Sequence, residues 1–103
     1  MALDFTGIDE AGATTGGHVP IECKTHTQLF WRLPQARFDL LERLRDYWED
    51  ALFTVDELPR LLAELDAYRR EQEDAALADI LRRMQAVVLQ ALDEGTAVEA
   101  IAD

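Results

Sequence analysis

Residues 56–95 read DELPRLLAELDAYRREQEDAALADILRRMQAVVLQALDEG, and their apolar positions decide the fold class. The segment predicts two helices, because large apolar residues recur every three or four positions. The apolar stripe of the first half falls out of phase with that of the second when it is counted straight through residues 69–74. We therefore expect a break near residues 71–74 and two antiparallel helices whose apolar faces pack together.

Capping residues mark the ends of these two helices. We expect Asp56 to be the N-cap of the first, which puts Pro59 at the third helical position, where proline is tolerated. A capping box of Thr54 and Glu57 is the rival, but it would place Pro59 where a hydrogen bond is required. Gly95 suits the C-cap of the second helix, because glycine adopts a positive φ without strain.

Upstream of this pair, residues 34–51 predict a further long helix. Pro34 suits its first turn, because a missing N–H has no intrahelical acceptor there. Large apolar residues follow at three- and four-residue spacing: Phe38, Leu41, Leu44, Trp48 and Leu52. On this spacing Trp48 belongs to the core, and Tyr47 lies at the margin of the apolar stripe. The sequence does not decide whether Trp31 is buried or exposed.

Residues 1–33 differ in character, because they hold four of the five glycines and most of the threonines. Apolar and polar residues alternate over residues 3–8 and 19–25, and each run predicts a half-buried strand. The glycine-rich residues 11–18 between them predict a mobile hairpin loop. Residues 96–103 predict either a third strand or a frayed tail.

Together these elements predict a single α+β domain over residues 1–103, with a small antiparallel sheet packed against three helices that occupy residues 34–95. A chain of 103 residues that is 49% hydrophobic has room for one core and no second domain. Three wide apolar helix faces exceed what one small sheet covers. We therefore also expect a homodimer that shares the Leu-rich helix surface.

The charge balance restricts the partners. Twenty-one acidic residues against ten basic ones give a net charge of -11, which repels nucleic-acid phosphates and anionic lipid headgroups. We expect neither nucleic acid nor a membrane as a partner. No apolar run approaches the roughly 18 residues of a membrane span, and the N-terminal stretch is acidic rather than signal-like. A cytoplasmic location is the expectation.

Catalytic or metal chemistry has few candidate residues in this chain. Serine and asparagine are absent, which excludes a serine nucleophile and N-glycosylation. His18, Cys23 and His26 are the only imidazole and thiol groups, but their spacing is not a familiar zinc pattern. A strand would turn Cys23 and His26 to opposite faces, with Cys23 inside. We expect no enzyme and no cofactor; a small metal-binding or thiol protein using these three residues is the alternative.

Carboxylates gather between Arg45 and Arg60, where the chain has no basic residue. Several would lie in the last turns of the predicted helix over residues 34–51, where the helix dipole disfavours acidic side chains. Asp93 and Glu94 break the same rule at the end of the last helix, and broken local rules tend to mark function. With Tyr47 as an aromatic anchor, the predicted partner-binding surface consists of Asp46, Tyr47, Glu49, Asp50, Asp56 and Glu57. A merely solvated face is the alternative.

Small size, strong acidity and the lack of catalytic groups resemble bacterial immunity proteins and antitoxins, although no motif is shared. The resemblance implies a non-catalytic inhibitor that covers a basic surface on another protein, such as a cationic nuclease-type toxin. The alternative is a structural or assembly subunit that homo-oligomerises through its apolar helix faces. Binding in that case would be nearly independent of salt.

Overall fold

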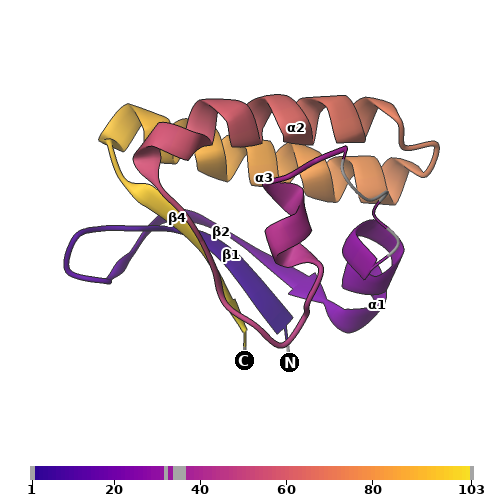
Figure 1. Cartoon of the computed structure of the whole chain (residues 1–103), viewed down its shortest axis with the longest axis horizontal. Coiled ribbons are helices and arrows are strands. Elements are labelled where there is room, and N and C mark those ends of the chain that lie inside the picture. Colours follow the sequence, from indigo (N-terminus) through magenta and orange to yellow (C-terminus); the bar gives the residue numbers. More distant parts are fainter. Residues whose placement is uncertain (1, 32, 34–36, 103) are drawn as a thin grey trace.

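A four-stranded antiparallel sheet and a pair of long helices form two layers (Figure 1). The computed structural model describes residues 2–31, 33 and 37–102. The strand order is β2-β1-β4-β3, and the strands are β1 (Ala2–Ile8), β2 (Thr14–Glu22), β3 (Ala51–Phe53) and β4 (Ala97–Ala102). The α+β class is confirmed, and β4 shows that the C-terminal segment is a strand rather than a tail.

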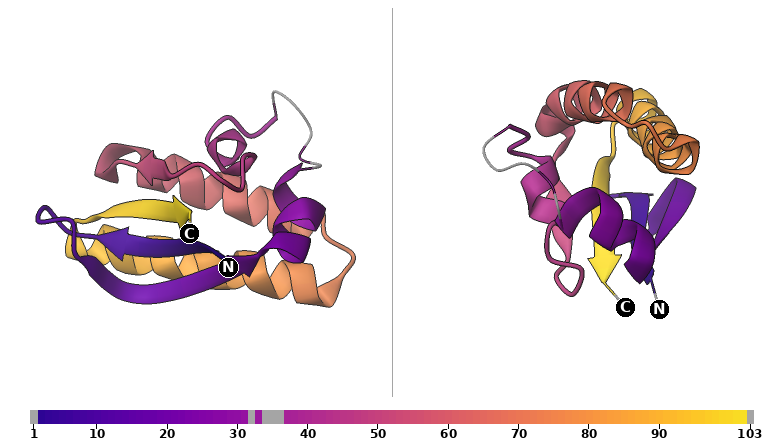
Figure 2. Two further views of the ribbon diagram at one scale, coloured as in Figure 1. Left: turned by 90° about the horizontal axis from the view of Figure 1, so that it is seen from below. Right: turned by 90° about the vertical axis from the view of Figure 1, so that its right-hand side faces the viewer.

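One face of the sheet forms the core. Phe5 lies opposite Val19 on one side and Ala100 on the other, and Ala100 in turn lies opposite Ala51. Paired residues of an antiparallel ladder point to the same face, and all four are buried. Figure 2 shows that the helical layer covers only this side of the sheet.

The helical layer consists of α2 (Leu58–Arg70) and α3 (Ala75–Glu94), with the break between them at residues 71–74, as predicted. Asp74 caps α3, since its carboxylate accepts the backbone N–H groups of Ala76 and Leu77. Gly95 ends α3 with a φ of 71°, which confirms its predicted role as the C-cap.

The start of α2 differs from the prediction. The N-cap is Thr54, which forms a capping box with Glu57, and not Asp56 as predicted. The first turn is a 3-10 turn, η3 (Val55–Glu57), and α2 begins only after it. Pro59 therefore lies in the first turn of α2, where its missing N–H has no intrahelical acceptor.

The N-terminal hairpin has a shorter loop than residues 11–18. Asp9 closes the turn, because its carboxylate accepts the N–H groups of Ala11 and Ala13, and Gly12 has a φ of 82°. Residues 14–18 belong to β2, so this part of the loop prediction is wrong.

The second strand ends at Glu22 and does not reach residue 25. The chain turns there into α1 (Cys23–His26) and a π-helical turn, η1 (Thr27–Trp31). This turn brings Leu29 and Phe30 into the core, and burial of these large side chains favours it over a longer strand. Cys23 is exposed rather than inside.

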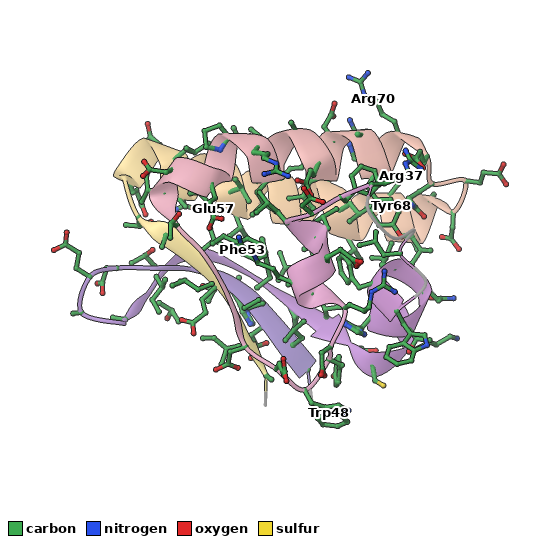
Figure 3. All side chains as sticks on the ribbon, viewed as in Figure 1. Arg37, Trp48, Phe53, Glu57, Tyr68 and Arg70 are labelled. Carbon is green, nitrogen blue, oxygen red and sulfur yellow. The ribbon has the colours of Figure 1, made fainter. Side chains whose placement is uncertain are left out.

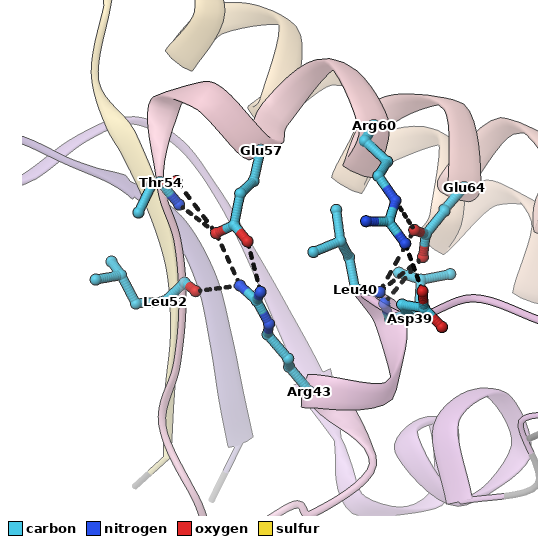
Figure 4. Close-up of polar contacts among 9 residues, drawn as sticks. Asp39, Leu40, Arg43, Leu52, Thr54, Glu57, Arg60 and Glu64 are labelled. Carbon is cyan, nitrogen blue, oxygen red and sulfur yellow. Dashed lines mark hydrogen bonds and ion pairs between the residues drawn. The ribbon is translucent and has the colours of Figure 1, made fainter. Parts of the chain in front are cut away.

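The long helix expected over residues 34–51 is wrong for the residues that the structure describes, and Pro34 lies outside them. The only regular helical piece in residues 37–51 is the 3-10 turn η2 (Leu41–Leu44), and Ala51 already begins β3. The carboxylate of Glu64, on α2, binds the N–H groups of Leu40 and Leu41 (Figure 4). Those donors are then satisfied without a regular helix.

The apolar faces of α2 and α3 are mostly buried within the chain itself. Leu61 and Leu65 of α2 and Leu81 and Met84 of α3 have no exposed surface. The residues that are only partly buried are Leu62, Leu77, Ile80 and Leu92, and Leu89 is exposed. Homo-oligomerisation stays a prediction, with less apolar helix surface available to it than the sequence suggests.

Candidate functional site

A groove of about 590 Å³ lies where η1 meets the chain between η2 and β3. Trp31 stands on one element and Trp48 on the other, and these are the only two tryptophans of the chain. Both are exposed, by 63% and 61%. We call this site the tryptophan groove, and its lining residues are Trp31, Glu42, Arg43, Arg45, Asp46, Trp48 and Glu49.

Trp48 and Tyr47 occupy the reverse of their predicted environments. Trp48 projects at the end of the molecule away from the helical layer (Figure 3). Tyr47 is 7% exposed, and its ring packs against those of His26 and Trp48. The prediction failed because it counted helical positions through a segment that is not a helix. The solvent-facing aromatic anchor is therefore Trp48 rather than Tyr47.

Arg45 joins the two walls of the tryptophan groove. Its guanidinium donates to the backbone carbonyls of Trp31, at 2.9 Å, and Leu33, at 2.5 Å, and pairs with Glu42 at 2.7 Å. Arg45 is the C-cap residue of η2, so a side chain at the end of η2 satisfies the backbone carbonyls of Trp31 and Leu33. The charge of Arg45 is therefore compensated by Glu42, which also lines the groove.

His26, at the end of α1 just before η1, contacts η2 from the core side. It is 2% exposed, its Nε2 lies 2.5 Å from the carbonyl oxygen of Leu44, and its ring packs against Phe30 and Tyr47. Burial lowers the pKa of His26, and this outweighs the hydrogen bond to Leu44 and the nearby charge of Asp46, which raise it. A neutral imidazole that donates to Leu44 fits this position.

Glu57 and Arg43 form a two-pronged ion pair, with distances of 2.8 and 2.5 Å (Figure 4). Arg43 also donates to the carbonyl of Leu52 at 3.0 Å, and Thr54 donates to Glu57. The hydrogen bonds from Arg43 and then from Thr54 lower the pKa of Glu57 to about 2. Glu57 therefore holds η3 against η2, and its charge is compensated.

Three other carboxylates of the predicted surface lie together in the turn that joins η2 to β3. Asp46 accepts the N–H of Trp48 at 2.8 Å, and Asp50 accepts the N–H of Ala102 at 2.7 Å, which ties the turn to β4. Among the described residues, no basic side chain pairs with Asp46, Glu49 or Asp50. The negative charge of this turn is left open to solvent.

The reason given for these carboxylates changes, although their position does not. Asp46, Glu49 and Asp50 do not end a helix, so no helix dipole opposes them in this turn. A short Asp side chain that binds its own backbone two residues on is typical of turns. Asp93 and Glu94 do end α3, as expected. Asp56 is exposed at η3 and is not part of the groove lining.

His18, Cys23 and His26 do not share a site. His18 pairs with Asp4 at 2.9 Å on β1, His26 is in the core, and Cys23 is exposed at the start of α1. No group of three or more His, Cys, Asp or Glu within residues 2–31, 33 and 37–102 is arranged to hold a metal ion. The structure therefore gives the metal-binding alternative no support.

Trp31, Arg45 and Trp48 were not among the predicted site residues. The sequence leaves the burial of Trp31 undecided, and its isolation from any helical stripe is the available signal. Arg45 bounds the acidic stretch, and no local pattern indicates its contacts with the carbonyls of Trp31 and Leu33. Indoles, guanidinium groups and carboxylates together suit recognition of a charged partner.

No described helix is long and apolar enough to cross a membrane. Comparison with protein-family models, with curated proteins and with solved structures gives no match for this chain.

Proposed function

We propose that this chain is a non-catalytic acidic protein-binding module that docks its tryptophan groove on a basic surface of another protein. The observation that carries the proposal is that both tryptophans of the chain are exposed and line one groove. Tryptophan is enriched among the residues that contribute most to binding energy at interfaces. An exposed pair beside carboxylates that have no basic partner among the described residues gives both an apolar anchor and a charge preference.

Charge supports the basic character of the partner. The net charge of -11 steers a positively charged partner toward the molecule, and Asp46 and Glu49 line the groove with Trp48, next to Asp50 in the same turn. A nuclease has to present positive charge to phosphates, so an acidic protein fits the same surface. An immunity-type or antitoxin-type inhibitor of such an enzyme is the specific form that we propose.

Charge reversal at Glu49 tests the proposal. The Glu49→Lys variant keeps the fold, because the Glu49 side chain is exposed and makes no hydrogen bond or ion pair with the described residues, while its backbone N–H still donates to the carbonyl of Asp46. Asp93→Lys is the matched control, since it makes the same change in net charge at the end of α3. Glu57→Lys is unsuitable, because it would break the ion pair with Arg43.

The measurement is quantitative capture of partners from the native host by immobilised wild type and by each variant, at low and high salt. We expect basic proteins that bind the wild type and Asp93→Lys, are lost with Glu49→Lys, and are released as salt rises. Equal recovery of every partner by Glu49→Lys and Asp93→Lys would contradict a role for the groove.

A further inference from the structure

We propose that the tryptophan groove receives an arginine side chain of the partner, whose guanidinium stacks on an indole and pairs with the carboxylate of Glu49. This inference rests on the proposed function and specifies the chemistry of its site. It starts from the groove itself, whose volume of about 590 Å³ exceeds that of one side chain and admits an arginine together with its flanking backbone.

The indoles provide the attraction for a cation. An indole face carries negative electrostatic potential, and a cation placed over it is stabilised, more so for tryptophan than for other rings. Trp48 already packs its neighbour Tyr47 edge-on, with ring centroids 5.1 Å apart and planes at 86°. This contact orients Trp48 while more than half of its surface stays open to a ligand.

The arginines of the groove do not oppose a cationic ligand, because each has its own carboxylate. Arg43 pairs with Glu57, and Arg45 pairs with Glu42. Asp46 and Glu49 are then the lining carboxylates without a basic partner among the described residues. The open charge of the groove is negative, which complements a cation and disfavours an acidic or a purely apolar occupant.

Two features favour arginine over lysine as the occupant. A guanidinium is planar and weakly hydrated, so it stacks on an indole at a lower desolvation cost than an ammonium group. It also donates two parallel hydrogen bonds to one carboxylate, as Arg43 does toward Glu57 in this same molecule. A lysine ammonium would supply the charge without the planar contact.

The test uses the intrinsic fluorescence of the intact protein, because its only two tryptophans both line the groove. Three peptides of one length and sequence are titrated, with arginine, lysine or the neutral isostere citrulline at the same positions. We expect a saturable change in emission with the arginine peptide and affinity weaker by about tenfold with the lysine peptide. The citrulline peptide should leave the emission unchanged.

Two variants localise the effect. Trp48→Leu keeps an apolar side chain but removes the indole, so the arginine peptide should bind about tenfold more weakly, as reported by Trp31, and its preference over lysine should vanish. Leu89→Ala alters an exposed apolar residue on α3 and should bind like the wild type. Circular dichroism confirms that both variants are folded.

The outcomes separate this inference from the proposed function. Equal affinity for arginine and lysine peptides, or unchanged binding by Trp48→Leu, overturns the arginine pocket even if Glu49→Lys still loses its basic partners. No response to any peptide also overturns it. Loss of the proposed function itself would appear instead as equal capture of partners by Glu49→Lys and Asp93→Lys.

Discussion

The helical layer and the segment between η1 and β3 carry apolar residues at the same spacing, yet only the helical layer forms long helices. Both long helices are capped by residues near in sequence, such as Asp74 and Gly95 for α3. Residues 37–50 are instead held by side chains from elsewhere, because Glu64 binds two of their N–H groups and His26 binds a carbonyl. Helical spacing of apolar residues does not by itself make a helix. The partners of the backbone N–H and carbonyl groups decide whether the chain is helical.

This difference has a functional consequence. A segment held by distant side chains can expose a large residue such as Trp48, because its side chains need not follow a helical stripe. Most large apolar residues of the helical layer lie in the core, whereas η1 exposes Trp31 and the irregular segment exposes Trp48. Substitutions in the two regions therefore compare support by distant side chains with support by local caps.

Replacing Glu64 by Ala should have the largest effect. The buried carboxylate accepts N–H groups of Leu40 at 3.0 Å and Leu41 at 3.2 Å, and its loss leaves two buried donors unsatisfied. We expect the free energy of unfolding to fall by about 3 kcal/mol in urea denaturation. Asp66→Ala, on the same helix and in partly exposed ion pairs, should cost much less. Equal losses would contradict a special role for Glu64.

Replacing Asp74 by Ala tests local support in the helical layer. Its carboxylate caps α3 through Ala76 at 2.8 Å, so we expect a loss of about 1 kcal/mol in the free energy of unfolding. Asp74→Asn should retain most of that stability, because an amide oxygen also accepts these N–H groups. Tryptophan emission should be unchanged in both variants, since the cap lies outside the groove. A shifted emission would mean that the two regions are not independent.

Acidification should weaken the irregular segment through His26. Burial lowers the pKa of His26 below its ordinary value of 6.5, so the unfolded chain takes up this proton before the folded chain does. Stability is therefore fully present above pH 6.5 and falls as the pH drops from there toward the lower pKa of the folded state.

Urea denaturation between pH 7.5 and about 5.5 measures this dependence, before most carboxylates titrate. His26→Phe should flatten it, because the titrating group is gone. Leu89→Ala is the control and should keep the slope of the wild type, because it replaces an exposed side chain that carries no titratable group. If His26→Phe and the wild type have the same slope, His26 is not the titrating support of the segment.

The smallest effect belongs to the ion pair of Glu57 and Arg43. The pKa of Glu57 in the folded chain is about 2, below its ordinary value of 4.5. Glu57 therefore contributes stability at a pH above 4.5, and this contribution is lost as the pH falls from 4.5 toward about 2. Glu57→Gln should flatten the dependence of stability on pH in this range. Arg43→Gln should do the same, and the double variant should add little. Additive effects of the two substitutions would show that the residues act separately.

Much of the fold is predictable from the sequence, because local patterns decide it. Three local patterns each predict an observed feature: the alternation over residues 3–8 predicts a strand, the phase slip at residues 71–74 predicts the break between the helices, and Gly95 predicts the end of α3. The segment over residues 34–51 is not predictable in this way. Phe38, Leu41 and Leu44 of its apolar stripe are buried, but Trp48 and Leu52 are exposed. The contacts that shape the segment come from Glu64 and His26.

The candidate site was predictable only in part. Carboxylates such as Asp46 and Glu49 stand out in the sequence because no basic residue separates them, and they do lie together. Their aromatic anchor was assigned to Tyr47, since the exchange of Tyr47 and Trp48 depends on the irregular backbone. Trp31 and Trp48 line one groove, and Arg45 holds the segment of Trp31 against η2 by binding carbonyls twelve and fourteen residues away. No sequence period reports such a contact.

Fluorine NMR of the protein labelled with 5-fluorotryptophan shows whether a partner docks on the tryptophan groove, because the chain has two tryptophans and both line the groove. The labelled protein is titrated with a basic partner captured as described above, with Glu49→Lys as the comparison. We predict that both resonances shift together as the wild-type complex forms and stay in place with Glu49→Lys. A complex that forms with wild-type affinity while both resonances stay unmoved would contradict docking through the tryptophan groove.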